Sequence, residues 1–191
     1  MNSVAAVRKA RGFTLIEVLV ALVVLLVGVM GAAGLMVRTV QQEVEAYQRL
    51  QALNLLQDMT DRMNANRGVV ECYSYGSTGA TLGYGVSTFT ACTSGSATEK
   101  AMVTADLTAW NNALNGVSEQ SGSNNSGAMV GARGCIVQVS AAERTYRITV
   151  AWQGMNKTVA PPADNTCGLN AFGDEKQRRI VSSIVRIGWL S

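Results

Sequence analysis

An apolar segment near the N-terminus constrains this chain more than any other feature of its sequence. Residues 13–37 contain a single charged side chain, Glu17, and the stretch from Val18 to Val37 contains only nonpolar residues. In helical form, a stretch of about 20 such residues is as long as a bilayer's hydrocarbon core is thick, about 30 Å. The segment therefore predicts a single membrane-spanning helix.

The flanking residues indicate the orientation and fate of this helix. Arg8, Lys9 and Arg11 precede it, which predicts a cytoplasmic N-terminus and a C-terminal part on the outer side of the membrane. A secretory signal peptide would have an apolar core of about 7–15 residues and a small-residue cleavage site after it. The apolar run here is longer and no such site follows. We therefore expect the segment to remain as an anchor.

Residues 11–17, Arg-Gly-Phe-Thr-Leu-Ile-Glu, lie where the basic leader meets the apolar segment. This stretch resembles the class III signal of type IV prepilins, in which a short hydrophilic leader ends in glycine and the apolar segment is retained. The resemblance implies cleavage between Gly12 and Phe13 by the prepilin peptidase, with N-methylation of the new Phe13 amine.

Glu17 is the one acid in the apolar segment. A carboxylate costs about 2.5–3.5 kcal/mol at the centre of a bilayer and less near the interface, so Glu17 could simply lie at headgroup level. The resemblance implies instead that Glu17 meets the terminal amine of a neighbouring subunit. A buried acid and a buried ammonium are each costly alone and tolerable as a pair. Such a pair would set the register in which subunits assemble.

Gly28, Gly31 and Gly34 interrupt the second half of the apolar segment. Small residues let neighbouring membrane helices approach closely. Alternatively, because each glycine costs a helix about 1 kcal/mol relative to alanine, the stretch could loosen when the helix leaves lipid for a fibre. The glycine-spaced sequence VGVMGAAGLM also resembles the PilV group of minor pilins.

The rest of the chain predicts an α+β, pilin-like fold, in which the long N-terminal helix packs on an antiparallel sheet. Between residues 40 and 66 there is no Pro or Gly, and apolar residues recur at helical spacing, so the helix is expected to continue to Asn66 with Met59 and Met63 in the core. The expected organisation is a cleaved leader (1–12), a membrane and assembly helix (13–37), an amphipathic continuation (38–67) and a globular domain (68–191).

Weaker patterns divide the globular domain. Residues 68–103 are rich in Gly, Ser and Thr and predict a loop region with short strands, and residues 115–134 predict a flexible segment. The regular elements expected are a short helix at 104–115 with Asp106 near its start, strands at 136–139 and 146–152 joined by a turn near 141–144, and a closing strand at 179–189.

Four cysteines, Cys72, Cys92, Cys135 and Cys167, all follow the apolar segment. No CxxC pair occurs among them, which argues against a zinc site, and an even number beyond a membrane anchor favours disulfides in an oxidising compartment. Four cysteines allow three connectivities. We prefer Cys72–Cys92 with Cys135–Cys167, because both loops are then local and the sheet is free to form.

Composition excludes several functions. The chain has no histidine, which rules out Ser-His-Asp and Cys-His catalysis and every metal site that contains histidine. The formal net charge is +3, but removal of residues 1–12 leaves 13 basic and 13 acidic side chains. No clustered positive charge remains to bind nucleic acid. No cofactor, metal or catalytic residue is expected.

These observations favour a structural subunit, a minor pilin that helps to initiate, prime or cap a type IV pilus. The resemblance implies the prepilin peptidase, other minor pilins, the major pilin and a tip adhesin as partners. It also implies a location in the inner membrane before assembly and in the pilus afterwards. A minor pseudopilin of a type II secretion system has the same leader and anchor and is the main alternative. A competence pilus subunit that binds DNA is disfavoured by the balanced charge.

Overall fold

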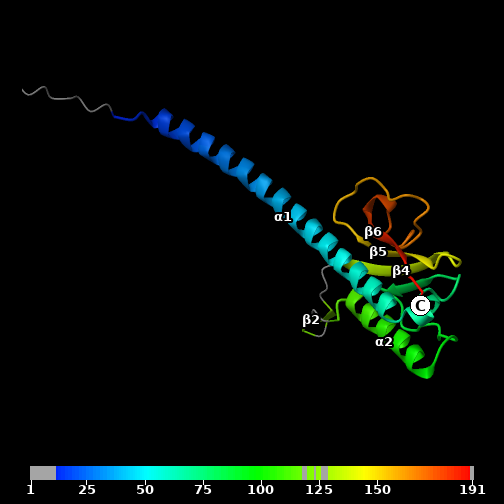
Figure 1. Ribbon diagram of the computed structural model, residues 1–191. Coiled ribbons are helices and arrows are strands. Elements are labelled where there is room, and N and C mark those ends of the chain that lie inside the picture. The colour runs from blue at the N-terminus through cyan, green and yellow to red at the C-terminus, as the bar shows by residue number, and fades with distance from the viewer. Residues whose placement is uncertain (1–11, 118–119, 123, 126–128, 190–191) are drawn as a thin grey trace, which may run out of the picture. The chain divides into compact units, whose positions relative to one another are not determined.

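The computed structural model describes residues 12–117, 120–122, 124–125 and 129–189 (Figure 1). The chain forms two compact units, Met1–Glu43 and Val44–Ser191. The basic leader residues Arg8, Lys9 and Arg11 lie outside the described residues. The regular elements are, in chain order, α1 (Leu15–Ala65), η1 (Arg67–Ser74), β1 (Ala80–Gly83), α2 (Ala97–Leu114), β2 (Gln120–Ser121), β3 (Asn124–Asn125), β4 (Val130–Ser140), β5 (Thr145–Gln153), η2 (Glu175–Gln177) and β6 (Arg178–Arg186).

Helix α1 is continuous for 51 residues and ends one residue before the predicted position. Its C-terminal part belongs to the second unit and carries the only buried residues of the helix, which recur every three or four positions: Gln48, Ala52, Leu55, Leu56, Met59 and Met63. Met59 and Met63 have no exposed surface, so their predicted place in the core is confirmed. This face is the one that packs on the sheet.

Four antiparallel strands form the main sheet in the order β1-β4-β5-β6. The predicted turn at 141–144 is confirmed, since β4 ends at Ser140 and β5 begins at Thr145. Strand β4 begins at Val130, six residues before the predicted start. The prediction was wrong because this stretch, with Gly131 and Gly134, has little strand propensity of its own and is held by pairing with β5.

The two faces of the sheet are covered differently. Ile136, Ile148 and Val150 face the main core, which they share with α1 and α2. On the opposite face, the segment between β5 and β6 folds back over part of the sheet, and a second small core forms there from Cys135, Ala151, Cys167 and Phe172. The C-terminal end of β5 is therefore buried on both faces, because the returning segment covers the second face.

Helix α2 begins at Ala97, seven residues earlier than predicted, so Asp106 lies in its middle and not near its start. The Ser96 hydroxyl accepts a hydrogen bond from the Glu99 N–H, and the Glu99 carboxylate accepts one from the Ser96 N–H, which is a capping box. The motif was present in the sequence as Ser-x-x-Glu. The prediction relied on apolar spacing and therefore missed the first two turns.

The segments predicted to be irregular contain some regular structure. The region 68–103 includes most of η1 and the start of α2, and the short β2–β3 pair lies in the segment predicted to be flexible. Two disulfides join Cys72 to Cys92 and Cys135 to Cys167, with Cα–Cα distances of 5.1 and 5.8 Å. This is the connectivity preferred from the sequence. The α+β arrangement of helix and antiparallel sheet is confirmed.

Candidate functional site

The described part of the N-terminal unit begins at Gly12, and its helix begins at Leu15. The backbone carbonyl of Thr14 accepts hydrogen bonds from the N–H groups of Glu17 and Val18, at 3.1 and 3.3 Å. Thr14 therefore occupies the position of a helix N-cap. Glu17 lies in the first turn, where a negative charge is favourable beside the positive end of the helix dipole.

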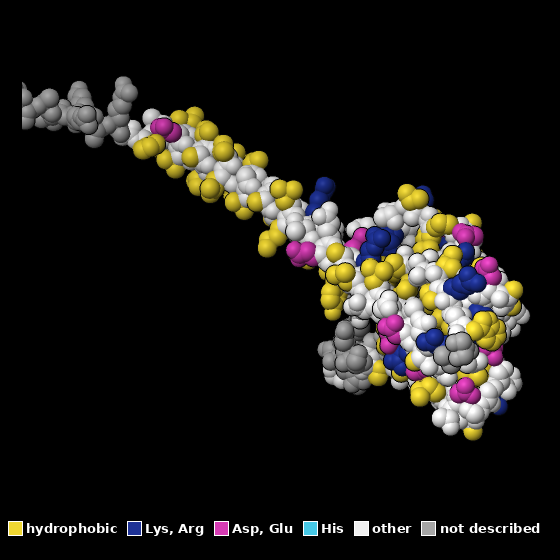
Figure 2. Space-filling view, in the orientation of Figure 1, with side chains coloured by type: hydrophobic (Ala, Val, Ile, Leu, Met, Phe, Trp, Pro, Cys, Tyr) yellow, Lys and Arg dark blue, Asp and Glu magenta, His cyan; other side chains and the backbone are white. Residues whose placement is uncertain are grey.

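The first half of α1 exposes apolar side chains on all sides. Figure 2 shows hydrophobic side chains along this length of the helix. Every residue from Gly12 to Val40 is exposed, with Phe13 at 81%. A helix that is apolar all round is stable only when lipid or other helices surround it. Burial of each large apolar side chain is favourable by about 1.5–3 kcal/mol, so this segment is stable only in a membrane or in a fibre.

The three glycines of this segment have open space beside them in the described part of the chain. A methyl group at Gly28, Gly31 or Gly34 would meet no atom within 4 Å outside the adjacent helix backbone. Packing within the chain therefore does not require glycine at these positions. Helix α1 is nonetheless regular through all three.

In the second unit, polar contacts fix the start of the buried part of α1 to the sheet. The Trp152 indole N–H donates to the Gln48 side-chain oxygen, at 3.2 Å. Glu45 lies about one helical turn before Gln48 on α1. The Arg179 guanidinium lies 3.5 Å from the Glu45 carboxylate and donates a hydrogen bond to the Asn156 carbonyl at 2.6 Å. These bonds attach both β5 and β6 to α1.

A buried acid joins the C-terminal end of α1 to η1 and α2. Asp106 of α2 accepts hydrogen bonds from the Tyr73 hydroxyl and from Arg62, which also pairs with Asp58. Burial, together with the Asp106 carboxylate, raises the pKa of Tyr73 well above its usual range. From the sequence we interpreted Asp58 and Asp61, next to Arg62, as a solvated helix surface. That interpretation missed Asp106, since no local signal connects Arg62 with a residue 44 positions further along the chain.

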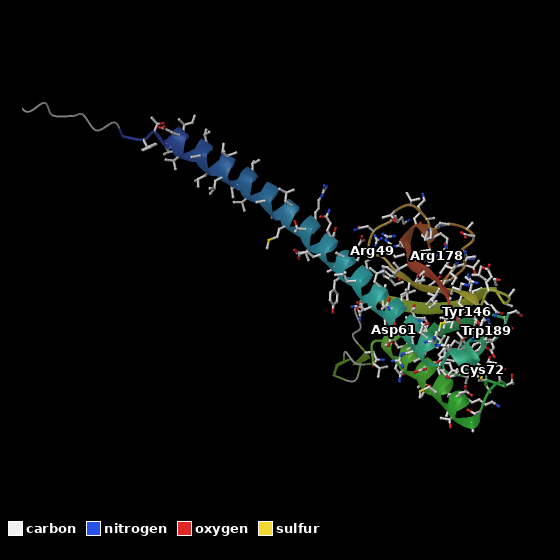
Figure 3. The ribbon with its side chains drawn as sticks, viewed as in Figure 1. Arg49, Asp61, Cys72, Tyr146, Arg178 and Trp189 are labelled. Carbon is white, nitrogen blue, oxygen red and sulfur yellow. A yellow bond between two sulfur atoms is a disulfide. The ribbon has the colours of Figure 1, made fainter. Side chains whose placement is uncertain are left out.

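Arg178 holds the segment that covers the outer face of the sheet. Its side chain is 1% exposed and donates to the Glu175 carboxylate at 2.6 Å and to the carbonyls of Asn165 and Cys167, at 2.7 and 3.1 Å. Figure 3 shows Arg178 among the side chains of this segment. With the Cys135–Cys167 disulfide, Arg178 keeps the segment ordered against the sheet.

Comparison with known families identifies the chain. Residues 7–33 match the prokaryotic N-terminal methylation motif. Residues 34–108, which include the rest of α1 and most of α2, match the family of type IV pilin Tt1218. The chain is a type IV pilin-like protein. No curated protein matches it, and no solved structure does.

Membership of this family explains why the first half of α1 is apolar and exposed. A pilin is anchored in the inner membrane by such a helix and is then assembled with other pilins into the pilus. The pilin families describe structural subunits and not enzymes. Among the described residues, no group of three or more acidic or cysteine side chains is placed to hold a metal ion.

The structure brings together only some of the residues singled out from the sequence. The four cysteines form two pairs in the second unit of the pilin. Gly12 and Phe13 precede α1, and Glu17 lies in its first turn. All three are exposed, and Glu17 has no ion pair with any residue in the described part of the chain.

Proposed function

We propose that this pilin is a minor subunit of the PilV type, which helps to initiate, prime or cap a type IV pilus. The observation that carries the proposal is the fully exposed apolar helix with one acid in its first turn, attached to a separate disulfide-bonded domain. The glycine-spaced segment at 28–34, which packing within the chain does not require, favours the PilV type.

The steps of assembly follow from the N-terminal residues. The prepilin peptidase cleaves between Gly12 and Phe13, and the Phe13 amine is methylated. Residues 13–37 then span the inner membrane, residues 38–67, in which α1 continues to Ala65, lead into the periplasm, and residues 68–191 form the periplasmic domain. The Glu17 carboxylate forms an ion pair with the N-terminal ammonium group of a neighbouring subunit, which is that of Phe13 or of the equivalent residue. Transfer from lipid to fibre exchanges one apolar surrounding for another, so it loses little hydrophobic stabilisation.

The proposed partners are other minor pilins, the major pilin and a tip adhesin. The experiment is to delete this pilin in its native host, count surface fibres by electron microscopy, and restore either the wild type or Glu17→Ala. We expect deletion to reduce the number of fibres severely and the wild type to restore it. We expect Glu17→Ala to fail while still inserting in the membrane.

Abundance then separates a minor from a major subunit. In sheared fibres, quantitative mass spectrometry should find this pilin at a few per cent of the main subunit or less. An amount equal to the main subunit would contradict the minor role. Unchanged fibre number after deletion, with the protein confined to membranes and secretion impaired, would identify a type II pseudopilin instead.

A further inference from the structure

Strand β6 forms an open edge of the main sheet, whereas the other edge, β1, is closed. Strand β1 has four residues, and its last N–H, from Gly83, donates to the Asn111 side chain at 2.7 Å. The Gly83 carbonyl accepts the N–H of Val86 as the chain turns away. Strand β6 has nine residues and an unbroken register with β5.

The backbone groups that β6 presents outward follow from its register. The Ile187 N–H donates to the Arg144 carbonyl at 3.0 Å, and the Gly154 N–H donates to the Gln177 carbonyl at 2.8 Å. Both pairs continue the β5–β6 register, so the odd-numbered residues of β6 bond to β5. The N–H and C=O groups of the even-numbered residues therefore point away from the sheet. For Ile180, Ser182, Ile184 and Arg186, no described residue forms a hydrogen bond with these groups.

The side chains of β6 do not protect this edge. Residues 180–185, Ile-Val-Ser-Ser-Ile-Val, contain no charge and no proline, and the strand has no bulge. Ile184 is 62% exposed. Natural proteins usually blunt such an edge with a lysine, a proline or a bulge, because an open β-branched strand accepts another strand. An added strand would gain backbone hydrogen bonds from four residues of β6.

The charge of Arg186 indicates which kind of strand can pair with the open edge of β6. In a pair of two copies with full overlap, centred on Ser182, Arg186 of each copy would stand opposite Arg178 of the other, which is buried and already paired with Glu175, so a second copy places no free carboxylate opposite Arg186. Arg178 and Arg186 mark the two ends of β6, and Arg186 is exposed with no ion pair among the described residues. A strand with a carboxylate opposite Arg186 would satisfy it.

We propose that β6 is a strand-addition site, occupied in the assembled pilus by an extended segment of another subunit with an Asp or Glu opposite Arg186. This inference rests on the proposed function, since the occupant belongs to the same fibre. The outward N–H groups of Ile180, Ser182, Ile184 and Arg186 supply the affinity. The exposed side chain of Ile184 and the charge of Arg186 supply the selectivity.

The test uses the full chain in its native host. The photo-cross-linking amino acid p-benzoyl-phenylalanine replaces Ile184, and in a control chain it replaces Thr108, an exposed residue of α2. Each cross-linked product from sheared fibres is mapped by mass spectrometry. The Ile184 probe is then combined with Ser182→Pro, which removes an outward N–H and none that bonds to β5, or with Ser182→Ala, which keeps it. Thermal unfolding in detergent checks that both variants fold alike.

We expect the Ile184 probe to link to a segment of a different subunit that contains Asp or Glu, and the Thr108 probe not to do so. Ser182→Pro should lower the cross-linked fraction about tenfold relative to Ser182→Ala, or exclude the chain from fibres, with melting temperatures that agree. Linkage to a second copy, a yield no higher than from Thr108, or equal yields from the two Ser182 variants would overturn strand addition. Absence of the wild-type chain from fibres would instead refute the proposed function.

Discussion

Removal of the Asp106 carboxylate should destabilise the second unit of this pilin far more than removal of the exposed carboxylate of Asp61. In Asp106→Ala, the buried Tyr73 hydroxyl loses its acceptor and keeps only the Arg62 carbonyl, which is 3.4 Å away. A buried unsatisfied donor costs about 1–3 kcal/mol. Arg62 is partly exposed and keeps Asp58, so the loss of its second ion pair adds little.

The expected cost of Asp106→Ala is therefore about 2–3 kcal/mol, which lowers the melting temperature by about 5–10 °C for a domain of this size. The assay is thermal unfolding of the full chain in detergent at pH 7 with the disulfides intact. Asp61 accepts only a hydrogen bond from Gln57 at the surface, so Asp61→Ala should change stability by less than about 0.5 kcal/mol. Equal effects of the two substitutions would refute the reasoning.

Alkaline pH gives a second readout of the same cluster. The pKa of Tyr73 is raised in the folded protein, chiefly by burial, above the value of about 10 for an unfolded tyrosine. Above pH 10 the unfolded chain releases this proton and the folded chain keeps it, so stability falls as pH rises. Tyr73→Phe should cost about 1–2 kcal/mol at pH 7 and should also make this alkaline decline shallower. A decline of unchanged slope would show that Tyr73 does not cause it.

Three further perturbations test other parts of the pilin. Ser96→Ala removes the α2 cap and should cost about 1 kcal/mol in thermal unfolding, whereas Ser96→Gly should cost a few tenths; a loss above 3 kcal/mol would point to another role. Replacement of both Cys135 and Cys167 by Ser opens a loop with a sequence separation of 32 and should cost about 3–4 kcal/mol in urea unfolding. A neutral result would mean that Arg178 alone holds the covering segment. Glu17→Gln should leave membrane insertion intact and reduce incorporation into fibres at least tenfold, as measured by immunoblots of sheared fibres; normal incorporation would exclude an electrostatic role for Glu17.

The sequence predicted those parts of the pilin whose signals are local. The apolar anchor, the amphipathic half of α1 and the β4–β5 turn all depend on residues close together in the chain, and the structure contains each of them. The start of α2 was missed although its capping box, Ser96 with Glu99, is also local. In that case the signal was available and was outweighed by the Gly, Ser and Thr content of the preceding segment.

The parts that the sequence could not predict depend on distant contacts. Asp106 contacts Arg62 and Tyr73 only after α2 packs beside α1. Neither the spacing of these residues nor the charge pattern of the sequence predicts the contact. The early start of β4 depends on β5. Arg178 was not singled out from the sequence, and it is buried because the carbonyls of Asn165 and Cys167, in the returning segment, accept hydrogen bonds from it. In each case tertiary packing overrides the local propensity.

The central claim is that the apolar helix, freed of its leader at Phe13, carries this pilin from the membrane into a fibre. Mass spectrometry of sheared surface fibres and of inner membranes from the native host tests this claim most directly, by following the peptide that begins at Phe13. We expect a low-abundance, N-methylated form that begins at Phe13 in the fibres. Uncleaved protein in both fractions would contradict it.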